Sequence, residues 1–188
     1  MTSAASASDA MTATAEQPAR TYAIRQYRTT AKFFHWLTAA LVVFMVASGV
    51  IATQLGDGAL ADTLFSVHKL TGATTLVVVL LRLIYRLLRP MPQLGDQPRT
   101  RPLLHWTLYV VVIAVPLLGW SGVSDFGARE IFPGFSLPAI WPEVAGYDGL
   151  LLHAHAYFAF SLLALIALHI GVAVQDYMTD DRRSQPAE

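Results

Sequence analysis

The sequence predicts an all-α integral-membrane protein, a four-helix bundle with both termini on the cytoplasmic side. The first observation behind this prediction is composition, since 54% of the 188 residues are hydrophobic and only 14% are charged. Ordinary soluble domains carry about 25% charged residues. The second is the presence of four apolar stretches that approach or exceed the ~20 residues needed to cross a bilayer. The third is the unequal distribution of charge among the segments that connect them.

The chain begins with a segment, residues 1–26, that is rich in Ala, Ser and Thr near its start and has no apolar core of a secretory signal. We expect this segment to be a disordered cytoplasmic tail. The membrane domain is expected over residues 27–178, and residues 179–188 should form a flexible cytoplasmic tail. The predicted spans are Phe33–Ile51, Leu70–Leu88, Leu103–Val123 and Leu150–Val174.

The connections between the spans differ in length and composition. The second, "RPMPQLGDQPR", contains three prolines and a glycine, which end one helix and delay the next. The third, "DFGAREIFPGFSLPAIWPEVAGYDG", is longer and carries aromatic residues suited to the membrane interface. We expect this third connection to lie over the outer face of the bundle.

Charge distribution predicts the orientation. Positively charged connections remain in the cytoplasm. The first and third connections are mainly acidic, with Lys69 and Arg129 as their basic residues. Basic residues instead cluster before the first span, around the second connection and near the C-terminus: Arg20, Arg25, Arg28, Lys32, Arg82, Arg86, Arg89, Arg99, Arg101, Arg182 and Arg183. This pattern places both termini in the cytoplasm.

Ionisable side chains at membrane depth are costly and indicate function. The chain has no cysteine, which excludes disulfides, covalently attached c-type haem and cysteine-ligated iron–sulfur clusters. It has six histidines, and any one of them could simply lie at the membrane interface. They are His35, His68, His105, His153, His155 and His169.

The spacing of the histidines suggests two pairs. Fourteen residues of helix separate His155 from His169, so they lie ~21 Å apart but only ~40° apart around the axis. His169 is near the cytoplasmic end of the fourth span and can meet His35, which begins the first. His155 is near the outer end and can meet His68, which opens the second span. His153 faces elsewhere and is expected to be an interfacial bystander.

Two histidine pairs stacked across an apolar bundle suit two non-covalent haem b groups, each bound by one imidazole on either face. Structural zinc is the main competitor, but it requires four ligands at one point and these pairs are too far apart to converge. An iron with both axial positions filled passes electrons and does not bind oxygen. The sequence therefore predicts metal ligation by His35, His68, His155 and His169, and one-electron transfer.

Several stretches together resemble the bacterial cytochrome b561 family, whose members are four-helix dihaem proteins related to cytochrome b subunits of formate dehydrogenases and hydrogenases. They are "FFHWL", "HKLTG" with "LLRLIYRL", "LLHWTLYVVVIAVPLLGW", "FPGFSLP" and "HAYFAFSLLALIALH". The resemblance covers about residues 27–178. It implies an outer haem on His68 and His155 and an inner haem on His35 and His169, in agreement with the helical spacing.

Three further residues are candidates for cofactor contacts. Arg82 lies fourteen residues after His68, at about the depth of the inner pair, and could bind a haem propionate, line a quinone pocket or reach the headgroups. Lys69 adjoins a predicted ligand and could neutralise an outer propionate or remain solvated. The resemblance implies that His105 is common in the family without binding iron, so it could bond a propionate or quinone, or mark the interface.

The leading hypothesis is an oxidoreductase of the bacterial inner membrane that moves electrons through two b haems to or from the ubiquinone pool. The resemblance implies that some family members oxidise superoxide at the outer surface. The predicted outer connections, however, carry six acidic and two basic residues, which provide no evident attraction for an anion. The alternatives are a haem-bearing subunit of a dehydrogenase and a transporter or assembly factor whose histidines move protons or metal ions. Membrane lipid, quinone and superoxide or a redox partner protein are the expected partners, and nucleic acid is not among them.

Overall fold

The computed structural model describes residues 3–89, 100–143 and 149–184, with side chains described at 29–89, 102–143 and 149–179. Four helices dominate these residues: α1 (Ser3–Leu55), α2 (Ala59–Leu88), α3 (Thr100–Asp125) and α4 (Leu150–Ser184). Strands β1 (Glu130–Phe132) and β2 (Phe135–Ser136) form an antiparallel hairpin between α3 and α4. The predicted all-α four-helix architecture is confirmed, with this small hairpin as an addition.

All four helices contain a segment long and apolar enough to cross a membrane. These segments are Thr29–Leu55, Ala59–Leu88, Pro102–Asp125 and Leu150–Thr179. Each contains the corresponding predicted span and extends beyond it at one or both ends. The second begins eleven residues earlier than expected, because the polar residues before Leu70 continue the helix instead of forming a loop.

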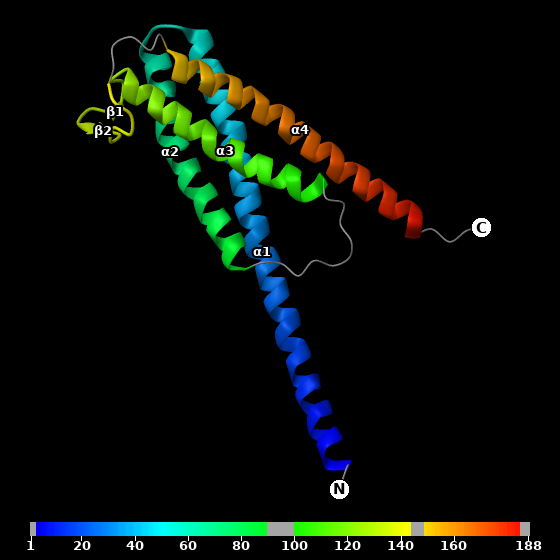
Figure 1. Ribbon diagram of the computed structural model, residues 1–188. Coiled ribbons are helices and arrows are strands. Elements are labelled where there is room, and N and C mark those ends of the chain that lie inside the picture. Colours follow the sequence, from blue (N-terminus) through cyan, green and yellow to red (C-terminus); the bar gives the residue numbers. More distant parts are fainter. Residues whose placement is uncertain (1–2, 90–99, 144–148, 185–188) are drawn as a thin grey trace.

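The helices form two antiparallel pairs. In Figure 1, α1 runs beside α2 and α3 runs beside α4, and α2 also contacts α3. A three-residue connection joins α1 to α2. Gly56 adopts a positive φ of 70° directly after α1, as is common for the residue that terminates a helix. This tight turn fixes which residues of α1 and α2 lie side by side.

Many large apolar side chains of the described helices point outward, as a lipid environment requires. Trp36 is 69% exposed and Tyr157 is 73% exposed, whereas Val79 and Leu162 are buried between helices. Buried hydroxyls on the helices bond to carbonyls of the preceding turn, as Thr75 does to Thr71 and Ser124 to Trp120. Such bonds satisfy polar groups where no water is available.

The β-hairpin lies at the end of the bundle where α1 turns into α2 (Figure 1). Lys69 of α2 donates hydrogen bonds to the backbone carbonyls of Ala128 and Glu130, and the Trp120 indole donates to the carbonyl of Pro138 at 2.9 Å. Ile131 in β1 and Leu137, which directly follows β2, are buried. The third connection therefore covers one end of the bundle, as its aromatic residues suggested.

Some predictions fall outside the described residues. These are most of the connection "RPMPQLGDQPR", the side chains of Arg20, Arg25, Arg28, Arg101, Arg182 and Arg183, the whole of Arg99, and parts of the two predicted tails. Helix α1 begins at Ser3, and its first part extends away from the other helices (Figure 1). The division into a tail and a membrane domain stays a prediction, as does the cytoplasmic position of the termini.

Candidate functional site

Four histidines form two facing pairs at different levels of the bundle. The ring centres of His68 on α2 and His155 on α4 are 6.0 Å apart, and those of His35 on α1 and His169 on α4 are 6.3 Å apart. We name them the outer pair and the inner pair, following the predicted topology. The sequence-based pairing thus agrees with the spatial arrangement of all four side chains.

These separations fit two imidazoles on opposite sides of one metal ion. A metal–imidazole bond is about 2 Å long and the ring centre lies about 1 Å from the nitrogen, so two such rings have centres about 6 Å apart. His105 on α3 is nearer to His169, with ring centres 5.2 Å apart. That separation is too short for linear ligation of one metal by both rings, so the geometry favours His35 as the partner of His169.

The outer pair borders a large cavity. Its volume is about 880 Å³, and it extends from the two imidazoles to the β-hairpin. Most of the lining is apolar, with Gly49, Gly119 and Trp120 near the pair and Lys69 at the hairpin. Cofactor pockets have this size and character. A flat hydrophobic ring with polar groups at its edge suits this lining.

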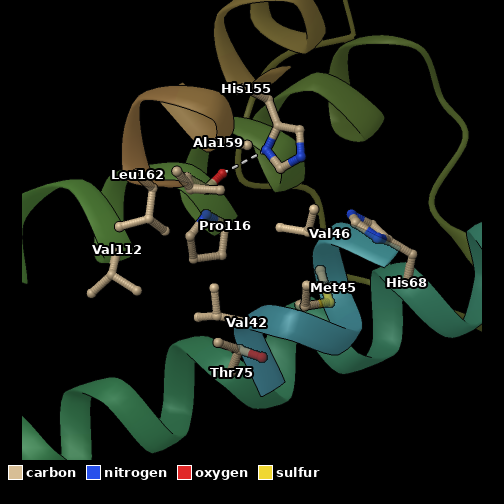
Figure 2. A pocket seen from close by; sticks show the side chains of 12 residues that line it. Val42, Met45, Val46, His68, Thr75, Val112, Pro116, His155, Ala159 and Leu162 are labelled. Atoms are coloured by element: carbon tan, nitrogen blue, oxygen red, sulfur yellow. Dashed lines mark hydrogen bonds between the residues drawn. The ribbon is translucent and has the colours of Figure 1, made fainter. Parts of the chain in front are cut away.

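A smaller cavity of about 60 Å³ continues from the outer pair toward the middle of the bundle. Figure 2 shows His68 and His155 extending toward this space from different helices, with Val42, Val112 and Leu162 on its walls. Its lining includes side chains from all four helices. The space between the helix pairs at this depth is therefore almost wholly apolar.

Each outer imidazole has its Nδ1 atom engaged by a neighbouring helix. The Nδ1 of His155 lies 2.8 Å from the backbone carbonyl of Val115 on α3, as the dashed line in Figure 2 marks. The Nδ1 of His68 lies 3.2 Å from Oγ of Ser48 on α1. The two Nε2 atoms have no part in these bonds and are available to a metal.

The inner pair has a different environment. Arg82 of α2 donates a hydrogen bond to Nδ1 of His35 at 3.1 Å, and its guanidinium lies 5.6 Å from the centre of the Tyr109 ring. Arg86 lies 5.5 Å from the same ring. Arg82 therefore stands at the depth of the inner pair, as its spacing from His68 predicted, in contact with a proposed ligand.

The remaining sequence candidates divide into two groups. Lys69 lines the large cavity but bonds to hairpin carbonyls, and His105 joins the inner pair through its ring contact with His169. His153 is exposed, and its Nδ1 contacts the carbonyl of Gly149 at the start of its own helix. In its described hydrogen bond, His153 therefore contacts neither histidine pair, in line with the expectation that it is an interfacial residue.

Ser48, Tyr109 and the Val115 carbonyl contact the histidines or Arg82, yet sequence reasoning did not single them out. A signal for Ser48 existed, because Ser48 and His68 are each ten residues from Gly58 in the tight connection. Residues equally far from the turn of an antiparallel helix pair lie side by side. No comparable signal marked Val115, since its contribution is a backbone carbonyl.

Comparison with known proteins places this arrangement in context. A family described as prokaryotic cytochrome b561 matches residues 26–179. Cytochrome b561 homolog 2 of Escherichia coli (strain K12) is 24% identical over 165 residues, which cover 82% of this chain and 86% of that protein. Probable superoxide oxidase CybB of Yersinia pestis is 27% identical over 149 residues, covering 71% of this chain and 82% of that protein.

Proposed function

Because the chain belongs to the prokaryotic cytochrome b561 family, we propose that it carries two b haems and transfers electrons between a donor or acceptor at one membrane surface and the quinone pool. Its family and its four membrane-spanning helices make it a multi-pass protein of the bacterial inner membrane with a role in electron transfer. The observation that carries the proposal is the presence of two histidine pairs with ring centres 6.0 and 6.3 Å apart at two levels of the bundle.

In this proposal His68 and His155 hold the outer haem, and His35 and His169 hold the inner haem. A haem held by either pair would supply one-electron chemistry, and ligation by two imidazoles would favour electron transfer over oxygen binding. The chain's own residues provide the ligands and an apolar, largely water-free surrounding that sets the redox potentials. Because α4 contributes one histidine to each pair, the two haems would lie one above the other and provide a path for electrons from one end of the bundle to the other.

Arg82, Lys69 and His105 are proposed as contacts of the cofactors' polar edges. A guanidinium in a membrane-spanning segment is stable only with a suitable partner, and a carboxylate binds Arg more strongly than a neutral imidazole does. Arg82 is therefore the proposed partner of an inner propionate. Lys69 lines the large cavity and is the corresponding candidate at the outer pair.

Superoxide is the proposed donor and ubiquinone the proposed acceptor. Two superoxide anions would give up one electron each and become O₂, while one ubiquinone takes two electrons and two protons and becomes ubiquinol. The name of the Yersinia pestis relative, a probable superoxide oxidase, favours this donor. The large cavity lies beside the outer pair, but Asp62 and Glu130 share its lining with Lys69, so the charged residues of this lining provide no net attraction for an anion.

Purified chain, reconstituted with ubiquinone and supplied with enzymatically generated superoxide, tests this function. We expect ubiquinol to form in a 1:2 ratio to the superoxide consumed, and His68→Ala to abolish the reaction. His153→Ala is the matched control and should retain it. If quinone is reduced only when a copurifying soluble enzyme is added, the chain is a haem-bearing subunit and the proposed donor is wrong.

A further inference from the structure

The hydrogen bonds of the outer pair define the protonation of both rings. A carbonyl oxygen only accepts, so Nδ1 of His155 carries the proton and donates it to Val115. The hydroxyl of Ser48 donates its own proton to the Met45 carbonyl at 3.1 Å, and the His68 ring also hydrogen-bonds to the Met45 backbone, so the Nδ1 proton of His68 is directed at two acceptors, Oγ of Ser48 and the Met45 carbonyl. Since a neutral imidazole has one N–H, both Nε2 atoms bear a free lone pair.

The same two neighbouring helices also make room for the rings. A Cβ atom on Gly119 of α3 would lie 2.9 Å from Nδ1 and 3.1 Å from Cε1 of His155. A Cβ atom on Gly49 of α1 would lie 3.0 Å from Cε1 and 3.2 Å from Nδ1 of His68. Any larger residue at these positions would push the imidazole away from its hydrogen-bond acceptor.

His68 and His155 each contact one hydrogen-bond acceptor and one glycine on a neighbouring helix, which is α1 for His68 and α3 for His155. On α1 the acceptor Ser48 is followed by Gly49, and on α3 the carbonyl of Val115 is one helical turn before Gly119. Metal-binding histidines generally donate their second ring N–H to an acceptor, which fixes the tautomer and the ring orientation and raises the basicity of the ligand. Both outer histidines have such an acceptor.

We propose that Ser48 with Gly49, and the Val115 carbonyl with Gly119, are the positioning residues of the outer haem ligands. The acceptor in each pair sets the tautomer that presents Nε2 to iron, and the glycine lets the ring reach that acceptor. This inference rests on the proposed function, because it takes His68 and His155 as ligands. It adds the residues that tune them.

The inner pair provides the contrast. Arg82 has only donors, so the Nδ1 atom of His35 accepts from it, and the proton of the neutral ring then lies on Nε2. Nδ1 of His35 thus lacks the acceptor that Nδ1 of His68 and of His155 have, so loss of these acceptors should affect the outer haem only.

The test uses the purified full-length protein with its haems, and the outer haem is defined as the one lost in His68→Ala. In Ser48→Ala one of the two acceptors of the His68 N–H is removed while the Met45 carbonyl remains, and the imidazole becomes less basic, which weakens its preference for ferric iron. We expect the ferric–ferrous equilibrium of the outer haem to shift about tenfold, equal to a rise of about 60 mV in its one-electron midpoint potential. The inner haem should keep its potential.

Three variants control this measurement. Ser48→Thr keeps a hydroxyl acceptor and should restore the wild-type outer potential. Ser161→Ala on α4 removes a hydroxyl whose described hydrogen bond is to a carbonyl of its own helix, at 2.8 Å, and should leave both potentials unchanged. Gly119→Ala should lose outer haem or shift its low-spin EPR signal, whereas Gly171→Ala, where a Cβ meets nothing within 4 Å, should not.

An unchanged outer potential and an unchanged outer EPR signal in both Ser48→Ala and Gly119→Ala would overturn the positioning role. The proposed function would survive that result, provided that the wild type holds two haems and His68→Ala loses one. Absence of haem from the wild type would instead refute the function itself. The two failures are thus distinguishable in the same set of preparations.

Discussion

At the scale of residues, Arg82 is the most informative side chain outside the histidines. It is a permanent cation within a membrane-spanning helix, and its described neighbours are the imidazoles of His35 and His169 and the ring of Tyr109, none of which is an anion at neutral pH. An ionisable group at such depth is retained for a function. A bound carboxylate beside His35 would supply the missing negative charge.

Replacement of Arg82 by glutamine should lower the midpoint potential of the inner haem. Removal of a nearby positive charge makes the ferric form easier to reach, and a change of about 1.4 kcal/mol in that balance corresponds to about 60 mV for one electron. Redox titration followed by absorbance measures it. Arg86→Gln is the matched control, since Arg86 contacts the same Tyr109 ring at 5.5 Å and is exposed; an equal shift in both variants would contradict the specific role of Arg82.

Residue contacts across the first helix pair could be predicted from the sequence to a useful degree. The short connection at Gly56–Gly58 fixes the register, so His35 and Arg82, 23 and 24 residues from Gly58, meet as Ser48 and His68 do. The second pair is different. In α3 and α4, contacting residues such as Gly119 and His155 are equally far in sequence from Leu137, which lies inside the long connection. No feature of the sequence marks Leu137 as the midpoint, so these contacts could not be predicted.

At the scale of elements, the close approach of α3 and α4 depends on a small residue near the outer end. Gly122 is buried, and a Cβ atom there would lie 2.5 Å from Cδ2 and 3.3 Å from the backbone N of Leu152. Small residues let membrane helices pack closely, where dispersion contacts replace the hydrophobic effect as the source of stability. The position of Leu152 also sets the start of the helix that carries two predicted ligands.

Gly122→Ala should therefore destabilise the protein. Overpacking of a tight contact costs about 1–3 kcal/mol, and we expect the midpoint temperature of unfolding in detergent to fall by several degrees. Release of haem on heating, followed at the Soret band, reports the transition. Gly171→Ala serves as the control on α4 and should unfold with the wild type; a Gly122→Ala variant of wild-type stability would show that the helices are not in this contact.

The β-hairpin is an element that sequence reasoning placed but did not identify. Aromatic residues suggested a segment over the outer face, and Phe132 and Phe135 do stack, with ring centres 4.9 Å apart. The strands themselves are only three and two residues long, too short for a periodic pattern. Their position depends on tertiary bonds from Lys69 and Trp120, which local sequence does not encode.

At the scale of the whole molecule, the orientation in the membrane follows from charge. The segments that join α1 to α2 and α3 to α4 lie at one end of the bundle (Figure 1) and are mainly acidic. Among the described side chains, Arg82, Arg86 and Arg89 lie near the opposite end of α2, whereas Lys69 and Arg129 are at the hairpin end. The positive-inside rule therefore predicts that the outer pair lies toward the periplasm and the inner pair toward the cytoplasm.

Reporter fusions in cells test this orientation. Green fluorescent protein fused after Glu188 should fluoresce, because it folds in the cytoplasm, and alkaline phosphatase inserted at Gly134 should be active, because it folds in the periplasm. The reverse insertions provide the control and should be silent. Fluorescence from a fusion at Gly134, together with phosphatase activity at the C-terminus, would show that the protein has the opposite orientation. The outer pair would then face the cytoplasm and the inner pair the periplasm.

The global architecture was accessible from sequence because each span is a long apolar run, and one face of α4 carries His155 and His169 fourteen residues apart. Helical geometry converts that spacing into two levels of one bundle. The acceptors and donors that distinguish the pairs could not be predicted in the same way. These hydrogen-bond partners depend on which atoms of adjacent helices come into contact, and those contacts are determined by the packing of the helices.

The central claim is that α4 presents imidazoles to two haems, with α2 and α1 supplying the opposite ligands. A pyridine haemochrome assay on purified protein tests it most directly, performed on the wild type and on alanine variants of His35, His68, His155 and His169. We predict two haems per chain in the wild type and in His153→Ala, and loss of one haem in each of the four single variants. One haem per wild-type chain, or a full complement after both α4 ligands are replaced, would contradict the account.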